Sequence, residues 1–127
     1  MELHIHDKRT IHEIQKEFSQ LFPNLKLEVF AEPCPHEKNT SHNKLLMHPS
    51  KAIGECRDKH LKGTLSISPQ MTVSDLKKGF NTNYGLCVEV FRKVGNDWLE
   101  TTVGVWPLEK QNATTTESNS ENTLEVV

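Results

Sequence analysis

The sequence contains one pattern twice, and this repetition constrains the fold more than any other feature does. The stretch LHIHDKRTIHEIQKEF begins at Leu3, and LSISPQMTVSDLKKGF begins at Leu65, 62 residues later. In both copies apolar and polar residues first alternate, which is typical of a half-buried strand. Apolar residues at spacings of three and four follow, as on one face of a helix. Each copy therefore predicts a strand followed by an amphipathic helix.

Matching residues mark where the two helices begin. Thr10 and Thr72 stand just before the apolar stripes, and Glu13 and Asp75 follow three residues later. A threonine hydroxyl at this position accepts a backbone N–H from the first helical turn, and an acidic residue three positions on completes a capping box. Both helices are therefore expected to start at their threonines.

Each predicted helix leads into a second strand and then a returning strand. The alternating stretches LKLEVF from Leu25 and LCVEVF from Leu86 are the second strands. After LCVEVF, a Gly-Asn pair supplies the positive φ angles of a tight hairpin turn, so the chain is expected to return with Leu99 on the core face. In the first copy the returning strand is expected from Lys44, after a polar insertion.

The predicted fold is α+β, with two pseudo-symmetric βαββ repeats whose helices pack on an antiparallel or mixed sheet in two layers. A lone unit would leave an apolar face exposed, whereas two units can bury a joint core. The first repeat is expected over residues 1–62, with a loop insertion at about 33–43, and the second over 63–112. Residues 113–127 lack periodicity and are predicted to be a disordered acidic tail.

Charge and cysteine content bear on location and partners. The 127 residues carry a net charge of −2, and three acidic residues lie in the tail, so the body is close to neutral. A neutral body does not favour nucleic acid or a membrane surface as partner. No apolar run approaches the roughly 18 residues needed to span a bilayer. Three cysteines cannot all pair within one chain, and no signal-peptide pattern occurs, so we predict free thiols and a cytoplasmic location.

The stretch MTVSDLKKGFNTNYGLCVEVFRKVGNDWLETT resembles a group of small uncharacterised bacterial proteins with a duplicated βαββ unit. The resemblance covers most of residues 44–112. It implies the same fold and a bacterial origin, and it implies no catalytic residue. The stretch VGVWPLEKQN departs from the more acidic version typical of that group.

The outward face of the second hairpin carries the predicted function. With a two-residue turn, Phe91 lies opposite Glu100 and Lys93 opposite Trp98, which makes Phe91 and Trp98 diagonal neighbours. Phe30 takes the place of Phe91 in the first copy. Exposed aromatic patches are typical of protein contacts, although the insertion or the closing turn can also cover such a face and make it a second small core. We predict a non-catalytic protein-interaction or assembly module that binds a protein partner or itself through Phe30, Phe91 and Trp98.

The alternative function uses the polar insertion. Cys34, His36, His42 and His48 are all possible zinc ligands, although their spacing matches no common structural zinc pattern. Across residues 32–62, six basic and four acidic residues give a charge of +2, and the basic ones are Lys38, Lys44, Lys51, Arg57, Lys59 and Lys62. A metal- or nucleic-acid-binding protein is therefore the alternative. Apart from zinc, no cofactor is expected.

Two smaller clusters point to chemistry only weakly. His4 and His6 share one face of the first strand and can form half of a metal site, but serines stand at the matching positions of the second copy. Cys56 stands four residues before His60, beside a positive charge that can activate a thiolate. No orienting acid, phosphate-binding loop, Cys-x-x-Cys or HExxH motif accompanies them. We therefore predict that the protein is not an enzyme, and these residues identify no small-molecule substrate.

Overall fold

The computed structural model describes residues 1–31, 46–101 and 106–113. The elements in this part of the chain are β1 (Glu2–Ile5), α1 (Ile11–Leu21), β2 (Leu25–Phe30), the 3-10 helix η2 (Ile53–Glu55), β3 (Gly63–Ser66), α2 (Val73–Tyr84), β4 (Cys87–Val94), β5 (Asp97–Glu100) and α3 (Leu108–Ala113). The strands form two antiparallel sheets, a β1–β3 pair and a three-stranded sheet in the order β2-β4-β5. The predicted α+β class is therefore confirmed.

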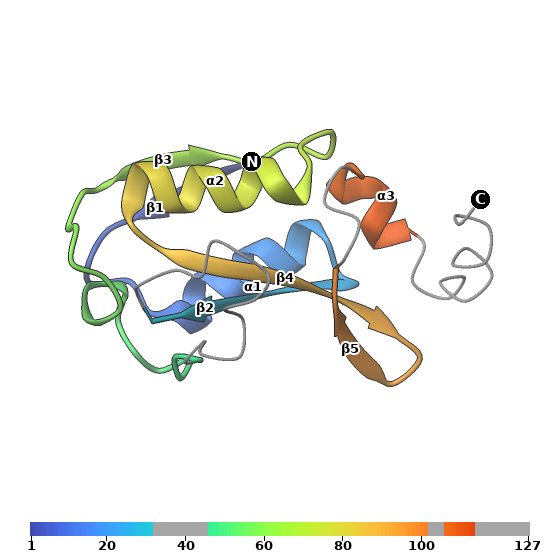
Figure 1. Ribbon diagram of the computed structural model, residues 1–127, viewed down its shortest axis with the longest axis horizontal. Helices are drawn as coiled ribbons and strands as arrows, with labels where there is room; N and C mark the ends of the chain where they lie inside the picture. Colours follow the sequence, from blue (N-terminus) through green and yellow to red (C-terminus); the bar gives the residue numbers. More distant parts are fainter. Residues whose placement is uncertain (32–45, 102–105, 114–127) are drawn as a thin grey trace, which may run out of the picture.

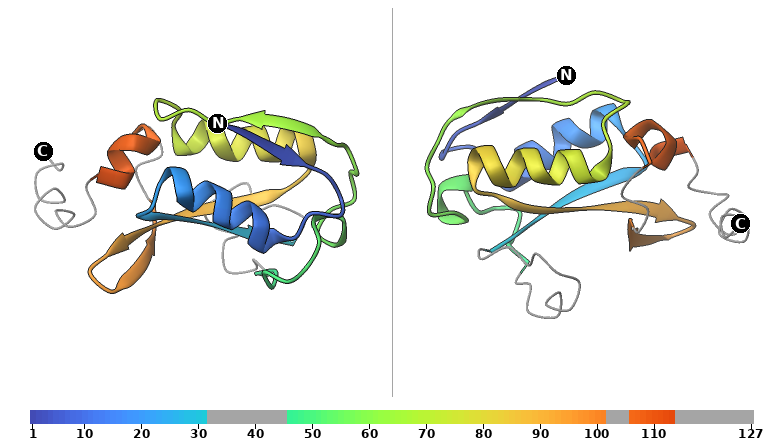
Figure 2. Two further views of the ribbon diagram at one scale, coloured as in Figure 1. Left: turned by 180° about the vertical axis from the view of Figure 1, so that it is seen from behind. Right: turned by 45° about the horizontal axis from the view of Figure 1, so that its top comes forward.

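These elements form two layers. The three-stranded sheet is one layer, and helices α1 and α2 with the β1–β3 pair form the other (Figures 1 and 2). Helix α1 packs on β2, and α2 packs on β4, so each helix covers the strand that follows it. β1 and β3 lie side by side although they come from opposite halves of the sequence.

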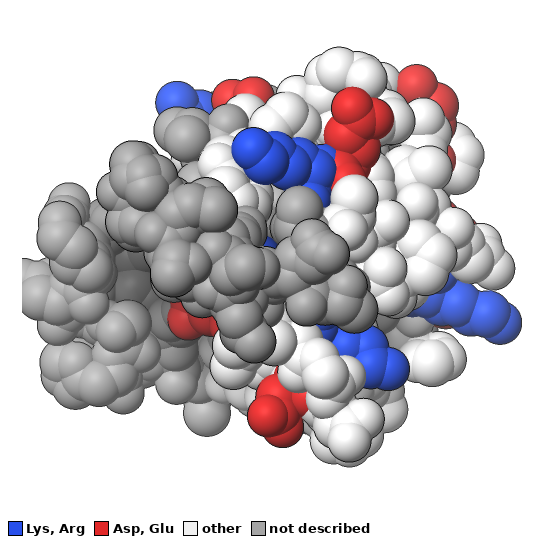
Figure 3. All heavy atoms as spheres, turned by 90° about the vertical axis from the view of Figure 1, so that its right-hand side faces the viewer, with Lys and Arg blue, Asp and Glu red and all other residues white. Residues whose placement is uncertain are grey.

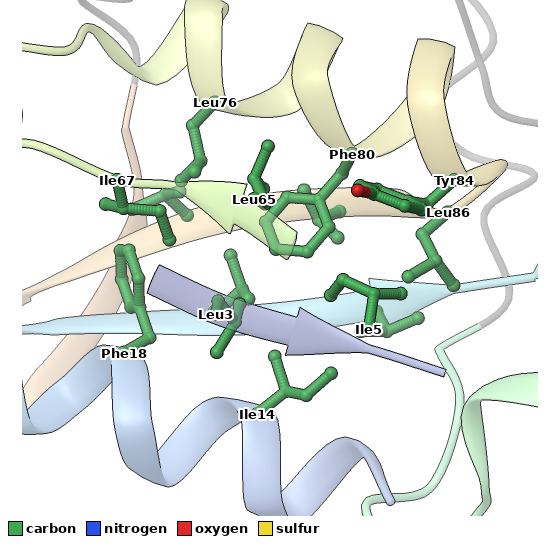
Figure 4. Close-up of a cluster of buried hydrophobic side chains, with 14 of the residues drawn as sticks. Leu3, Ile5, Ile14, Phe18, Leu65, Ile67, Leu76, Phe80, Tyr84 and Leu86 are labelled. Atoms are coloured by element: carbon green, nitrogen blue, oxygen red, sulfur yellow. The ribbon is translucent and has the colours of Figure 1, made fainter. Parts of the chain in front are cut away.

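The core between the layers draws on both halves of the chain. Nine side chains at its centre are almost fully buried: Leu3, Ile5, Ile14, Phe18, Leu65, Ile67, Leu76, Phe80 and Leu86 (Figure 4). Each buried side chain of this size contributes about 1.5–3 kcal/mol through the removal of apolar surface from water. Because α1, α2 and both sheets all contribute, neither half has a separate core among the described residues.

Both helices begin where the sequence predicts. The backbone N–H of Glu13 donates to Oγ1 of Thr10 at 3.2 Å, and that of Asp75 donates to Oγ1 of Thr72 at 3.1 Å. In turn, the backbone N–H of each threonine donates to the carboxylate of the acidic residue, which completes both capping boxes. Helix α2 ends at Gly85, whose φ of 67° lies in the left-handed region that favours glycine.

The strand pairings are centred on matching residues of the two halves. In the β1–β3 pair, Leu3 is opposite Leu65, and the offset between them is the 62 residues of the sequence pattern. In the β2–β4 pair, Glu28 is opposite Glu89, 61 residues apart. The same offset of 61 separates LKLEVF from LCVEVF.

Two predicted features of the returning strands differ in the structure. The first returning strand was expected from Lys44, which lies outside the described residues, and Leu46 forms only an isolated bridge with Phe30. Leu99 lies on the expected face, since it is opposite the core-facing Arg92, but it is not buried, because 49% of its surface is exposed. Leu99 is exposed because β5 pairs with the last residues of β4, where the hairpin extends beyond the rest of the fold (Figure 1).

The segment before the C-terminal tail forms the short helix α3. The backbone N–H of Asn24 donates to Oδ1 of Asn112 at 2.7 Å, and the Asn24 side chain donates to the Asn112 carbonyl at 3.1 Å. These bonds hold α3 against the turn between α1 and β2. The predicted insertion and residues 114–127 lie outside the described part. Within the described ranges, no helix combines the length and apolar character needed to cross a bilayer.

Candidate functional site

The β4–β5 hairpin has the register that the sequence predicts. Gly95, with a φ of 64°, and the asparagine after it form the two-residue turn. Lys93 is opposite Trp98, and Phe91 is opposite Glu100. Phe91 and Trp98 therefore lie diagonally on the outward face of the three-stranded sheet.

Lys26 joins these two aromatic residues into one cluster. It is opposite Phe91 in the β2–β4 pairing, and its Nζ lies 6.0 Å from the Phe91 ring centre and 5.0 Å from the Trp98 ring centre. The same Nζ is 3.1 Å from a carboxylate oxygen of Glu28. A cation over an aromatic face at an exposed site contributes about 0.5–1 kcal/mol. We call Lys26, Phe91 and Trp98 the aromatic cluster.

Phe30 stands apart from the aromatic cluster. It pairs with Cys87 at the opposite end of the β2–β4 ladder, four residues along the strand from Lys26. At about 3.3 Å per residue this separation is about 13 Å. Phe30 is also buried, with 7% of its surface exposed, whereas Phe91 is half-buried and Trp98 is 36% exposed. The structure therefore brings two of the three predicted residues together.

Strand β5 is the most exposed of the described strands. All four of its residues are exposed, and Trp98 and Leu99 point to opposite faces of it. β5 pairs with β4 along one edge, and its other edge has no strand partner among the described residues. On the face of the molecule seen in Figure 3, the basic and acidic side chains that are described intermingle rather than gather by sign. The described residues of this face therefore form no extended patch of one charge sign.

The predicted metal ligands are not assembled in the described part of the chain. Cys34, His36 and His42 lie outside the described residues. His48 is exposed, and its Nδ1 lies 2.9 Å from Oγ of Ser50 and accepts the Ser50 backbone N–H at 3.1 Å. No group of three or more potential ligands occurs within residues 1–31, 46–101 and 106–113. Zinc binding stays a prediction.

A polar network that the sequence analysis missed ties three distant segments together. Asp7, after β1, accepts two hydrogen bonds from the Arg57 guanidinium at 2.8 and 3.2 Å. Arg57 also donates to the Tyr84 carbonyl at the end of α2, at 2.8 Å, and its side chain is fully buried. His60 Nδ1 lies 2.9 Å from the other oxygen of Asp7. The contact with Arg57, and then that with His60, lowers the pKa of the Asp7 carboxyl.

The environment of Cys56 is that of a buried structural thiol. Its side chain is 4% exposed, and its Sγ donates to the Ala52 carbonyl at 3.5 Å. Burial raises the pKa of the Cys56 thiol, which is the opposite of what a thiolate nucleophile needs. The two groups that suggested activation, Arg57 and His60, both bind Asp7 instead. This geometry does not favour thiolate chemistry at Cys56.

The prediction that all thiols are free is wrong for Cys87, which is disulfide-bonded, whereas Cys56 is free. An odd cysteine count guarantees one unpaired thiol but does not keep the others reduced. The cytoplasmic location, which was inferred partly from free thiols, stays a prediction.

The two histidines near the start of the chain line an open groove. His4, in β1, and His6, just after it, are exposed and line a groove of about 680 Å³ with Arg9, Glu17 and Lys62. Arg9 binds Glu17 through both of its terminal nitrogens, at 2.6 and 3.3 Å. The Glu17 carboxylate is therefore engaged by Arg9, and it forms no three-ligand group with the two histidines in the described part of the chain.

Comparisons with protein-family models, with curated proteins and with solved structures find no significant match to this chain. The resemblance to small bacterial proteins therefore stays a prediction.

Proposed function

We propose that this protein is a non-catalytic interaction module, built from a duplicated βαββ unit, that binds a protein partner through its β4–β5 hairpin. The observation that carries the proposal is the position of Trp98. This residue is 36% exposed on a strand whose four residues are all exposed. Tryptophan is among the residues most enriched at the energetic centres of protein interfaces. A partner that covers Trp98 gains the burial of a large aromatic surface.

The strand pairing fixes the backbone positions of the aromatic cluster, which favours binding. Lys26, Phe91 and Trp98 come from three neighbouring strands of one sheet, so their positions are fixed by the backbone pairing. A surface that is already ordered loses less conformational entropy when a partner binds. Leu99, on the other face of β5, extends the apolar surface around the edge of the hairpin.

The edge of β5 indicates how the partner binds and what charge it carries. Addition of a strand to an exposed sheet edge is a common mode of recognition, in which main-chain hydrogen bonds give affinity. Asp97 and Glu100 flank the two apolar residues of β5. A second copy of β5 paired along this edge would bring four carboxylates together, and like charges across strands are destabilising. The charges therefore favour a different protein with basic residues over self-association.

The duplication supports a special role for the second hairpin. The pairs Leu3–Leu65 and Glu28–Glu89 at the centres of the two ladders are what two related units around a pseudo-twofold axis would produce. The units differ where the returning strands lie. Among the described residues, the first contributes the isolated bridge at Leu46, whereas the second contributes the whole of β5. Divergence at this place is consistent with one unit keeping the core and the other providing the contact surface.

The double substitution Phe91→Ala and Trp98→Ala tests the proposal. We expect it to weaken capture of the partner in pull-downs from native lysate of the source organism by about 30-fold or more, because the loss of even one interface hot spot costs at least about 2 kcal/mol. Partners are identified by mass spectrometry with the unmodified protein as reference. Circular dichroism should show an unchanged fold, since neither residue belongs to the main core.

Leu61→Ala is the matched control. Leu61 is 52% exposed but lies in the segment before β3, far along the chain from the hairpin. This variant should capture the partner as the unmodified protein does. If the double variant captured the partner as strongly as the unmodified protein, the hairpin would not be the binding surface. An equal loss of capture in the double variant and in Leu61→Ala would show an unspecific effect of exposed apolar residues.

A further inference from the structure

Arg92 occupies a position in β4 where the alternation of the strand calls for an apolar residue. It shares a sheet face with the buried Val88 and Val90, and it is itself only 8% exposed. Its partners on the neighbouring strands are Leu25 and Leu99, which offer no charge. Nη1 of Arg92 is buried and has no hydrogen-bond partner in the described part of the structure.

A buried guanidinium nitrogen without a hydrogen-bond partner is unusual because the charge of an arginine cannot be removed. The guanidinium stays protonated at all ordinary pH values, so burial cannot be relieved by loss of a proton. Buried charges in proteins are therefore paired or bound to ions. The same chain pairs its other buried arginine fully, since Arg57 makes three hydrogen bonds to Asp7 and the Tyr84 carbonyl. Arg92 departs from this pattern.

A second unsatisfied polar atom lies beside Arg92. The backbone N–H of Thr101 donates to the Val90 carbonyl at 3.0 Å, which continues the β4–β5 ladder and places Thr101 opposite Val90. Arg92 and Thr101 are therefore diagonal neighbours on one face of the sheet, within reach of a long side chain. Oγ1 of Thr101 is also buried without a hydrogen-bond partner in the described residues. Both groups can donate a hydrogen bond.

We propose that Arg92 and Thr101 form a binding site for an oxyanion, a carboxylate or phosphate group of a small ligand. The planar guanidinium matches two oxygens of such a group, and the threonine hydroxyl can donate to one of them. An anion compensates the buried charge, whereas a water molecule would supply only an acceptor. The site lies on the face of the hairpin opposite to the aromatic cluster, so it is independent of the proposed protein contact.

Titration calorimetry with inorganic phosphate, and separately with acetate, tests the site in a chloride buffer of constant ionic strength. We expect one molar equivalent of at least one of the two anions to bind, and the probe that binds more tightly identifies the class of oxyanion. Arg92→Met should weaken this binding by more than tenfold. Thr101→Val should weaken it several-fold, because it removes one donor and keeps the charge.

Lys93→Met is the matched control, because it removes the same charge from the next residue of β4, which is exposed on the opposite face. This variant should bind the anion as the unmodified protein does. Thermal unfolding gives a second readout: at a tenfold excess of anion over its Kd, the Tm of the unmodified protein should rise by about 4 °C or more, and that of Arg92→Met should stay constant. Absence of binding by both anions, or an equal effect in Arg92→Met, would overturn the proposal.

Discussion

Replacing Phe80 with alanine is expected to lower the free energy of unfolding by about 4 kcal/mol. The Phe80 side chain is completely buried on α2 and lies among side chains of β1 and β3 in the centre of the core (Figure 4). Removal of the ring loses the free energy gained by burying its apolar surface and leaves a cavity that the surrounding strands can only partly close. Urea unfolding, followed by circular dichroism, measures the effect.

Phe18→Ala should have an effect of the same size, because Phe18 takes the corresponding place on α1 and is equally buried. Leu61→Ala, at an exposed position, should change stability by less than about 0.5 kcal/mol. A loss below about 1 kcal/mol for Phe80→Ala would mean that α2 does not pack into the core as described.

The substitution Asp7→Asn is expected to destabilise the protein by about 2 kcal/mol near neutral pH. It leaves the fully buried guanidinium of Arg57 without its compensating charge. Loss of one partner of a buried pair costs about 3–5 kcal/mol, and we take a smaller value because the Asp7 side chain is 41% exposed. Tyr84 would still accept its hydrogen bond from Arg57.

The effect should depend on pH in a defined direction. The folded protein lowers the pKa of Asp7 from its ordinary value of 3.8, so the ionised carboxylate stabilises the fold above that value. This stability is lost as the pH falls through the lower folded pKa. The Asp7→Asn variant lacks the carboxylate and so lacks this contribution at every pH. The difference between the two proteins should therefore be constant from pH 5 to 7 and shrink below pH 4.

Asp97→Asn makes the same chemical change on the exposed hairpin and is the control. Denaturant unfolding at pH 2.5, 4 and 6 gives the three differences. A deficit for Asp7→Asn that is as large at pH 2.5 as at pH 6 would show that the carboxylate charge is not the cause.

Local chemistry explains which parts of the fold the sequence could predict. The caps at Thr10 and Thr72 and the two-residue turn at Gly95 depend on neighbouring residues, and all three were found, although in the turn only Gly95 has the positive φ expected of both residues. Strand faces followed from alternation. The burial of β5 could not be predicted in this way. Alternation tells which face of β5 is turned toward the core side of the sheet, but not whether other elements cover that face. Leu99 is exposed for this reason.

Polar contacts between residues far apart in the sequence were also beyond sequence-based prediction. Asp7 and Arg57 are 50 residues apart in the sequence, and no spacing rule connects them. Arg92 did give a signal that could have been used. The series Leu86, Val88, Val90 places the next residue of that face at position 92, where an arginine breaks the apolar pattern. A charged residue at a core-facing strand position indicates either a buried pair or a ligand site.

Native-state hydrogen exchange of Phe18→Ala and Phe80→Ala tests most directly whether the two halves share one core. If they do, both variants should lose protection by the same factor in the most protected amides of β1, β2, β3 and β4, since a shared core opens as one unit. A loss confined to β1, α1 and β2 in Phe18→Ala, with β3, α2 and β4 unchanged, would contradict the account.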